Sequence, residues 1–164
     1  MTRFAKRLSL ASVLLLCGVA NAFEVDALHS GMSFQEARSV IERFSYSKVE
    51  IKENYIGAWD ILATGTNRSI YLNFCKGRLV QVQKHLQPRF DYFVRLVDEK
   101  RKQLGHPTDA WSEPTDVTSA VESNAIRFLW RDKNDYIVVS YIQFPSNNQL
   151  DISHRIKNEC WQVP

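Results

Sequence analysis

Four histidines are the side chains of this sequence best suited to acid–base or nucleophilic chemistry: His29, His85, His106 and His154. His154 has the most suggestive neighbours, because Asp151 and Ser153 are residue types found in hydrolase triads. In a strand, however, residues 151 and 153 point to the face opposite residue 154, so the three cannot act together locally. A histidine with a packing or surface role is therefore expected. Only residues brought together from distant segments would make the chain a small hydrolase.

No motif for a cofactor or a catalytic metal accompanies these histidines. The HExxH, GxSxG and glycine-rich phosphate-binding patterns are missing from the sequence, and no cluster has the spacing of metal ligands. We therefore expect no catalytic, cofactor-binding or metal-binding residues, and we interpret the chain as a protein that is not an enzyme.

The first 22 residues have the three parts of a secretory signal peptide. These parts are a basic start, a short apolar run and a small-x-small cleavage site, formed by Arg3, Lys6 and Arg7, then residues 8–19, then Ala20-Asn21-Ala22. The run is shorter than the roughly 20 residues that span a bilayer, and no second long apolar segment follows. We predict cleavage before Phe23, no transmembrane segment in the mature chain, and a periplasmic or secreted location.

Export changes the charge of the working protein. The chain has 21 Lys and Arg against 18 Asp and Glu, and the first 22 residues hold three basic and no acidic side chains, which leaves 18 against 18. A neutral mature protein lacks the net basic charge typical of nucleic-acid binding, so no nucleic-acid partner is expected. Residues 23–164 fit one ordinary domain.

Two cysteines, Cys75 and Cys160, follow the signal segment. In an oxidising compartment one disulfide between them is the simplest prediction. A free reactive thiol or a metal pair is the alternative, but neither has a CxxC spacing or a nearby histidine cluster to support it.

Helix and strand patterns occur twice. Ser33 and Glu36 form a capping box before a helix expected over 34–44, and a second helix is expected after Pro88, ending at Gly105. Alternating segments predict four strands after the first helix and three after the second, with a turn at Lys76-Gly77 and a loop over 106–123. The fold class is α+β, in the order α-ββββ-α-βββ, with both helices on one side of antiparallel sheet. The two halves are 28–86 and 88–161, and whether they share one sheet stays open.

Aromatic residues carry the remaining functional signal. Tyr71 and Tyr141 are expected on strand faces opposite the aliphatic residues, and Tyr and Trp are enriched in protein interfaces. The candidate partner-binding residues are Tyr71, Tyr141, Trp111 and Tyr136. The alternative is ordinary packing in strands and core.

Two short segments suggest kinship. The stretch 28–37, LHSGMSFQEA, and the hairpin 71–80, YLNFCKGRLV, resemble segments of BamE/SmpA-type outer-membrane assembly proteins and of β-lactamase inhibitor proteins. The resemblance covers about residues 28–84 and implies a non-catalytic extracytoplasmic protein that binds another protein. This chain lacks the lipidation site of the first family and the cysteine pairs within each repeat of the second. No partner-binding residue of either family can be matched here.

The sequence thus favours a non-catalytic protein-binding module of the bacterial cell envelope, serving as a periplasmic accessory or assembly factor. An exported inhibitor of an enzyme and a small periplasmic hydrolase are the alternatives.

Overall fold

The structure is a computed structural model that describes residues 22–60, 68–118 and 121–160. Its first long element is helix α1 (Phe34–Arg43), preceded by the short strands β1 (Glu24–Val25) and β2 (Leu28–His29). The predicted capping box is present: the Glu36 amide donates to the Ser33 hydroxyl, and the Ser33 amide donates to the Glu36 carboxylate over 2.9 Å. This pairing satisfies backbone donors that a helix start leaves free.

A four-stranded meander follows α1. It consists of β3 (Lys48–Lys52), β4 (Tyr55–Trp59), β5 (Ser69–Cys75) and β6 (Arg78–Leu86). The turn between β5 and β6 is at Lys76 and Gly77, as predicted, and both residues have positive φ angles, 49° and 72°. Glycine reaches such angles without strain, which suits the second turn position.

The second half repeats this order. Helix α2 (Phe90–Leu104) begins two residues after Pro88, and four strands follow: β7 (Asp109–Thr118), β8 (Val121–Asp132), β9 (Asp135–Gln143) and β10 (Asn148–Ile156). Two ion pairs with a spacing of four residues stand on α2, with Arg95 to Asp91 at 3.1 Å and Lys102 to Asp98 at 2.7 Å.

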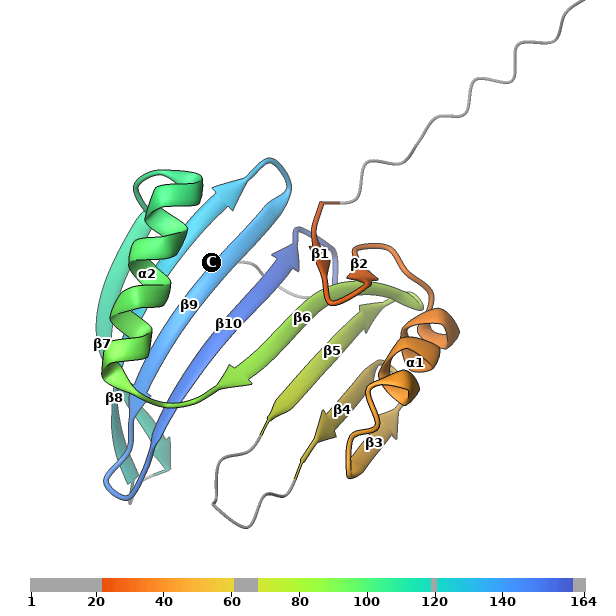
Figure 1. The fold of residues 1–164 in the computed structure, drawn as a ribbon, viewed down its shortest axis with the longest axis horizontal. Helices are drawn as coiled ribbons and strands as arrows, with labels where there is room; N and C mark the ends of the chain where they lie inside the picture. The colour runs from red at the N-terminus through yellow and green to blue at the C-terminus, as the bar shows by residue number, and fades with distance from the viewer. Residues whose placement is uncertain (1–21, 61–67, 119–120, 161–164) are drawn as a thin grey trace, which may run out of the picture.

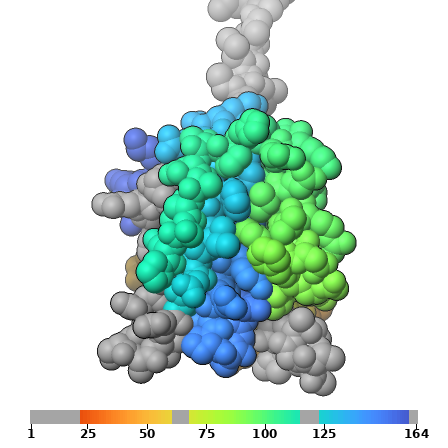
Figure 2. All heavy atoms as spheres, turned by 90° about the vertical axis from the view of Figure 1, so that its left-hand side faces the viewer, coloured from red at the N-terminus to blue at the C-terminus, as the bar shows by residue number. Residues whose placement is uncertain are grey.

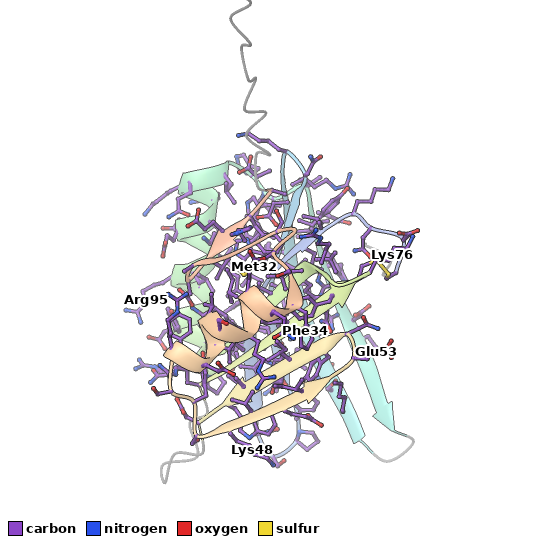
Figure 3. All side chains as sticks on the ribbon, turned by 90° about the vertical axis from the view of Figure 1, so that its right-hand side faces the viewer. Met32, Phe34, Lys48, Glu53, Lys76 and Arg95 are labelled. Carbon is purple, nitrogen blue, oxygen red and sulfur yellow. A yellow bond between two sulfur atoms is a disulfide. The ribbon has the colours of Figure 1, made fainter. Side chains whose placement is uncertain are left out.

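The eight long strands form one continuous antiparallel sheet in the order β3-β4-β5-β6-β10-β9-β8-β7. The last strand of each half, β6 and β10, pair at the centre and join the halves. Both helices lie on the same face (Figures 1 and 3). Helix α1 packs its buried Ala37, Val40 and Ile41 on the first meander, while α2 packs Phe93 and Leu96 against Trp130 and its neighbours. This burial of one helix face and one sheet face supplies most of the apolar core.

The predicted element order was wrong. The second half has four long strands, and in the described part of the chain strand residues far outnumber helical ones, so this is a mainly β protein. The predicted order lacked the two short strands β1 and β2. Its larger error is β7, which was expected to be loop because it contains Pro114 and several polar residues. Since β7 is an edge strand and pairs only with β8, a proline without an amide donor is tolerated there. Figure 2 shows this edge, with β7 in teal beside α2 in green.

The predicted disulfide is present between Cys75 and Cys160, whose Cα atoms are 5.7 Å apart. It ties the segment after β10 to the β5–β6 turn, next to Lys76 (Figure 3). Within the described ranges, no helix has the length and apolar composition needed to cross a membrane. The predicted signal segment, apart from Ala22, lies outside the described residues.

Candidate functional site

The sheet has one face without a helix, here called the helix-free face. Asp151 lies on it, because its strand neighbours Leu150 and Ile152 pack in the α2 core on the other side. The strand register places one residue from each of the eight strands in a single row across this face. The row is Lys48, Trp59, Ser69, His85, Asp151, Ser140, Arg127 and Trp111. A tryptophan near each end therefore brackets a polar centre.

An aromatic cavity of about 330 Å³ lies toward the β3 end of this row. Its lining residues are Glu50, Tyr55, Trp59, Ser69, Tyr71 and His85. The rings of Tyr55 and Tyr71 are stacked with centroids 6.1 Å apart, and the Tyr71 ring lies 4.7 Å from that of His85. Lys48 and Lys52 on the edge strand lie over Trp59 and Tyr55 at 5.0 and 5.7 Å. The cavity thus offers flat apolar surface with polar groups around it, a composition common in binding sites.

Gly57 lets the Tyr55 ring lie across the sheet. A Cβ atom on residue 57 would fall 2.9 Å from the ring carbon Cζ of Tyr55, closer than real contacts allow. Tyr55 is thereby placed beside Tyr71, whose strand position pairs with Gly57. The absence of a side chain at residue 57 therefore leaves room for the ring that forms one wall of the cavity.

His85 and Asp151 form the polar centre of the row. The His85 Nε2 atom lies 3.3 Å from the Asp151 Oδ1 atom, and Gln149 donates to the Asp151 Oδ2 atom over 2.8 Å. The contact to Oδ1 is within ion-pair range but is not aligned as a hydrogen bond, which leaves that buried oxygen without a hydrogen-bond donor among the described residues. Burial lowers the pKa of His85 and raises the pKa of Asp151, since enclosure disfavours both charged forms.

Two arginines lie near this centre, Arg127 on β8 and Arg155 on β10. Arg127 pairs with Glu113 of the edge strand, and Arg155 donates from Nε to the Ser153 hydroxyl over 3.2 Å. Burial lowers the pKa of Arg155, as does the charge of Arg127, while Asp151 acts in the opposite direction. The face therefore holds alternating charges as well as aromatic rings.

The predicted partner-binding residues separate into two sets. Tyr71, Trp111 and Tyr136 lie on the helix-free face. Trp111 belongs to the row described above, Tyr71 is two residues from Ser69 on β5, and Tyr136 is four residues from Ser140 on β9, so each points to the same side as the row. Tyr141 lies on the helix-covered face instead, with its ring 5.4 Å from Phe93 and 5.5 Å from Phe90. Its expected position opposite the aliphatic residues was wrong, because α2 covers the face that carries it.

Sequence reasoning missed His85, Asp151 and Arg155. They come together only because β6 pairs with β10, and those strands are more than 60 positions apart. Asp151 and Arg155 alternate with apolar residues, so the sequence places them on one face of a strand. The sequence around them does not show that β6 is the strand that pairs with β10.

The histidine with triad-like neighbours lies elsewhere. His154 is on the helix-covered face, where its Nδ1 atom lies 2.8 Å from the Asp135 Oδ2 atom, while Asp151 and Ser153 lie on the helix-free face, as strand alternation predicts. Ser69 and His85 are cross-strand neighbours, yet no hydrogen bond joins their side chains among the described residues. The described part of the chain also contains no group of three or more His, Cys, Asp or Glu residues placed to hold a metal ion.

Comparison with known proteins found no counterpart for this chain: no family model, no curated protein and no solved structure matches it.

Proposed function

We propose that this protein is an exported, non-catalytic binding module of the bacterial cell envelope that docks another protein on its helix-free face. The observation that carries the proposal is the row of side chains across the sheet, with Trp59 near one end and Trp111 at the other. Both tryptophans are partly exposed, as is Tyr71 beside them. No helix covers them, so a partner can bury them.

The composition of this face fits a protein interface. Interfaces are enriched in Trp, Tyr and Arg, and a few such residues carry most of the binding energy. The helix-free face has all three types within one sheet, including Tyr55, Tyr71 and Arg127. Backbone pairing in the sheet already fixes the positions of these side chains, so binding a partner costs little additional conformational entropy.

Export is supported by two independent features. The basic, apolar and small-residue parts of residues 1–22 are typical of a signal peptide, and the Cys75–Cys160 disulfide suits an oxidising compartment. The alanine-rich cleavage region is typical of bacterial signals. Together they favour the periplasm or the medium.

The test is affinity capture with crosslinking, using the oxidised chain 23–164 as bait against envelope and secreted fractions. The bait is compared with Tyr71→Ala and Trp111→Ala, and with Arg95→Ala on the exposed face of α2 as the matched control. We expect the two aromatic variants to lose the specific partner by at least about tenfold while the control keeps it. A specific envelope complex supports an assembly factor, and a single soluble enzyme supports an inhibitor. Equal capture by all three variants would exclude this face as the interface.

A further inference from the structure

Arg155 lies on the helix-free face, on one of the two central strands of the sheet and one residue before the end of β10. It belongs to β10, next to the junction strand β6, where it pairs with Gln81, and on its other side it pairs with Tyr136 of β9. Its side chain is partly buried. The guanidinium is oriented by one hydrogen bond, from Nε to the Ser153 hydroxyl.

The guanidinium forms no salt bridge with any described residue. Among the described residues, no Asp or Glu oxygen lies within ion-pair distance of Arg155, and neither terminal amino nitrogen has a hydrogen-bond acceptor. Neither nitrogen is sealed from solvent, since both are missing from the set of fully enclosed polar atoms without partners. Placing a charge in a partly enclosed site is costly unless it is paired, so an arginine without a salt bridge on a binding face is suited to an external partner.

The other arginines of this face are already engaged. Arg127 pairs with Glu113 on the edge strand, and the Arg131 guanidinium lies over the Tyr136 ring at 5.5 Å from its centroid. Among the described residues, Arg155 is thus held in place by a hydrogen bond and forms no salt bridge, while the charge of Asp151 acts on it from beyond ion-pair distance.

We infer that Arg155 is the receptor for a single carboxylate of the docked partner, from an aspartate or glutamate side chain. The inference rests on the proposed function and specifies one contact of that interface. Because Nε is held by Ser153, the two terminal amino groups form a fixed fork that matches the two oxygens of a carboxylate.

A carboxylate fits this position better than a phosphate or a polyanion. Asp151 is close enough to influence the charge of Arg155, and Glu113 lies on the same face. Glu113 already neutralises the neighbouring cation Arg127, so the site has no spare positive charge for a second or third charge on the ligand. The mature chain is also neutral overall, with none of the excess basic charge that polyanion binding requires.

The first arm of the test uses sodium acetate as the probe and reads the arginine Nε–Hε signals of the oxidised chain by NMR. The Arg155 signal is assigned by its loss in Arg155→Lys, and Arg131 serves as the exposed reference. At constant ionic strength, acetate should shift the Arg155 signal several-fold more than the Arg131 signal, and chloride should not. Equal shifts for both arginines would overturn the inference, and so would a larger effect of phosphate than of acetate.

The second arm uses the captured partner. Arg155→Gln should weaken capture by about tenfold or more, because it leaves the partner's carboxylate buried and unpaired, and Arg95→Gln on α2, away from this face, should leave capture unchanged. Thermal unfolding of both variants confirms that they are folded. If Arg155→Gln captures the partner normally while Tyr71→Ala does not, Arg155 does not bind a carboxylate of the partner, but the helix-free face is still the docking surface. If Tyr71→Ala and Trp111→Ala both capture normally, the docking face itself is wrong.

Discussion

The Nε2 atom of His85 lies 3.3 Å from the Oδ1 atom of Asp151, across the junction at which the two halves of the sheet pair. Their side chains are 25% and 8% exposed. Burial is the main cause of the lowered pKa of His85, and the nearby carboxylate only partly offsets it. The folded protein therefore resists protonation of a histidine at its centre.

Acid should destabilise the protein through His85. Between the lowered pKa of the folded state and the ordinary value of about 6.5, the unfolded chain binds this proton more readily, so the free energy of unfolding falls as pH falls. His85→Gln removes the titration, and we expect a smaller loss between about pH 7.5 and about pH 5 in urea unfolding. His106→Gln, at an exposed position, is the control. A pH dependence as steep in His85→Gln as in the wild type would contradict this account.

The disulfide should contribute several kcal/mol to stability. It closes a loop between residues 85 positions apart, and constraint of the unfolded chain over such a loop contributes about 4 kcal/mol in the chain-entropy model. Urea unfolding of the Cys75→Ala, Cys160→Ala double variant measures the loss. Wild-type protein with a reductant should unfold at the same midpoint as this variant. A loss below about 1 kcal/mol would show that the bridge constrains little.

The capping box should be measurable by a single substitution. Ser33→Ala removes the hydroxyl that accepts from the Glu36 amide, and such caps contribute about 1 kcal/mol. Ser39→Ala is a suitable control because that exposed hydroxyl only donates back to the Gln35 carbonyl within the helix, so its loss should change stability by less than about 0.5 kcal/mol. If both variants unfold at the same urea concentration, the cap is not a stabilising feature.

Local chemistry made part of this fold predictable. The capping box at Ser33 and the turn at Lys76-Gly77 depend on residues within a few positions of one another, and both are present as expected. The disulfide followed from counting cysteines in a chain expected to be exported. Each of these features is decided by short-range geometry or by a choice among very few partners.

The missed features depend on long-range pairing. Strand β7 contains Pro114, which argues against a strand until the position of β7 at a sheet edge is known. Likewise, the pairing of β6 with β10 decides that His85 faces Asp151, and alternation within each strand says nothing about which strands are neighbours. Tyr141 was placed on the wrong face for the same reason, because its burial depends on where α2 packs.

The contact between Gly57 and Tyr55 can be tested by a double-mutant cycle. Gly57→Ala in the wild type places a Cβ atom against the Tyr55 ring and should cost about 1–3 kcal/mol, as overpacking does. In the Tyr55→Ala background that space is empty, so the same substitution should cost little, because alanine is no worse than glycine in a strand. Urea unfolding of the four proteins should therefore give a coupling of at least about 1 kcal/mol. Additive effects would mean that the ring moves away freely and that Gly57 does not position the wall of the aromatic cavity. In that case Gly57→Ala should also leave partner capture unchanged, whereas a positioned ring predicts that Gly57→Ala and Tyr55→Ala weaken capture together.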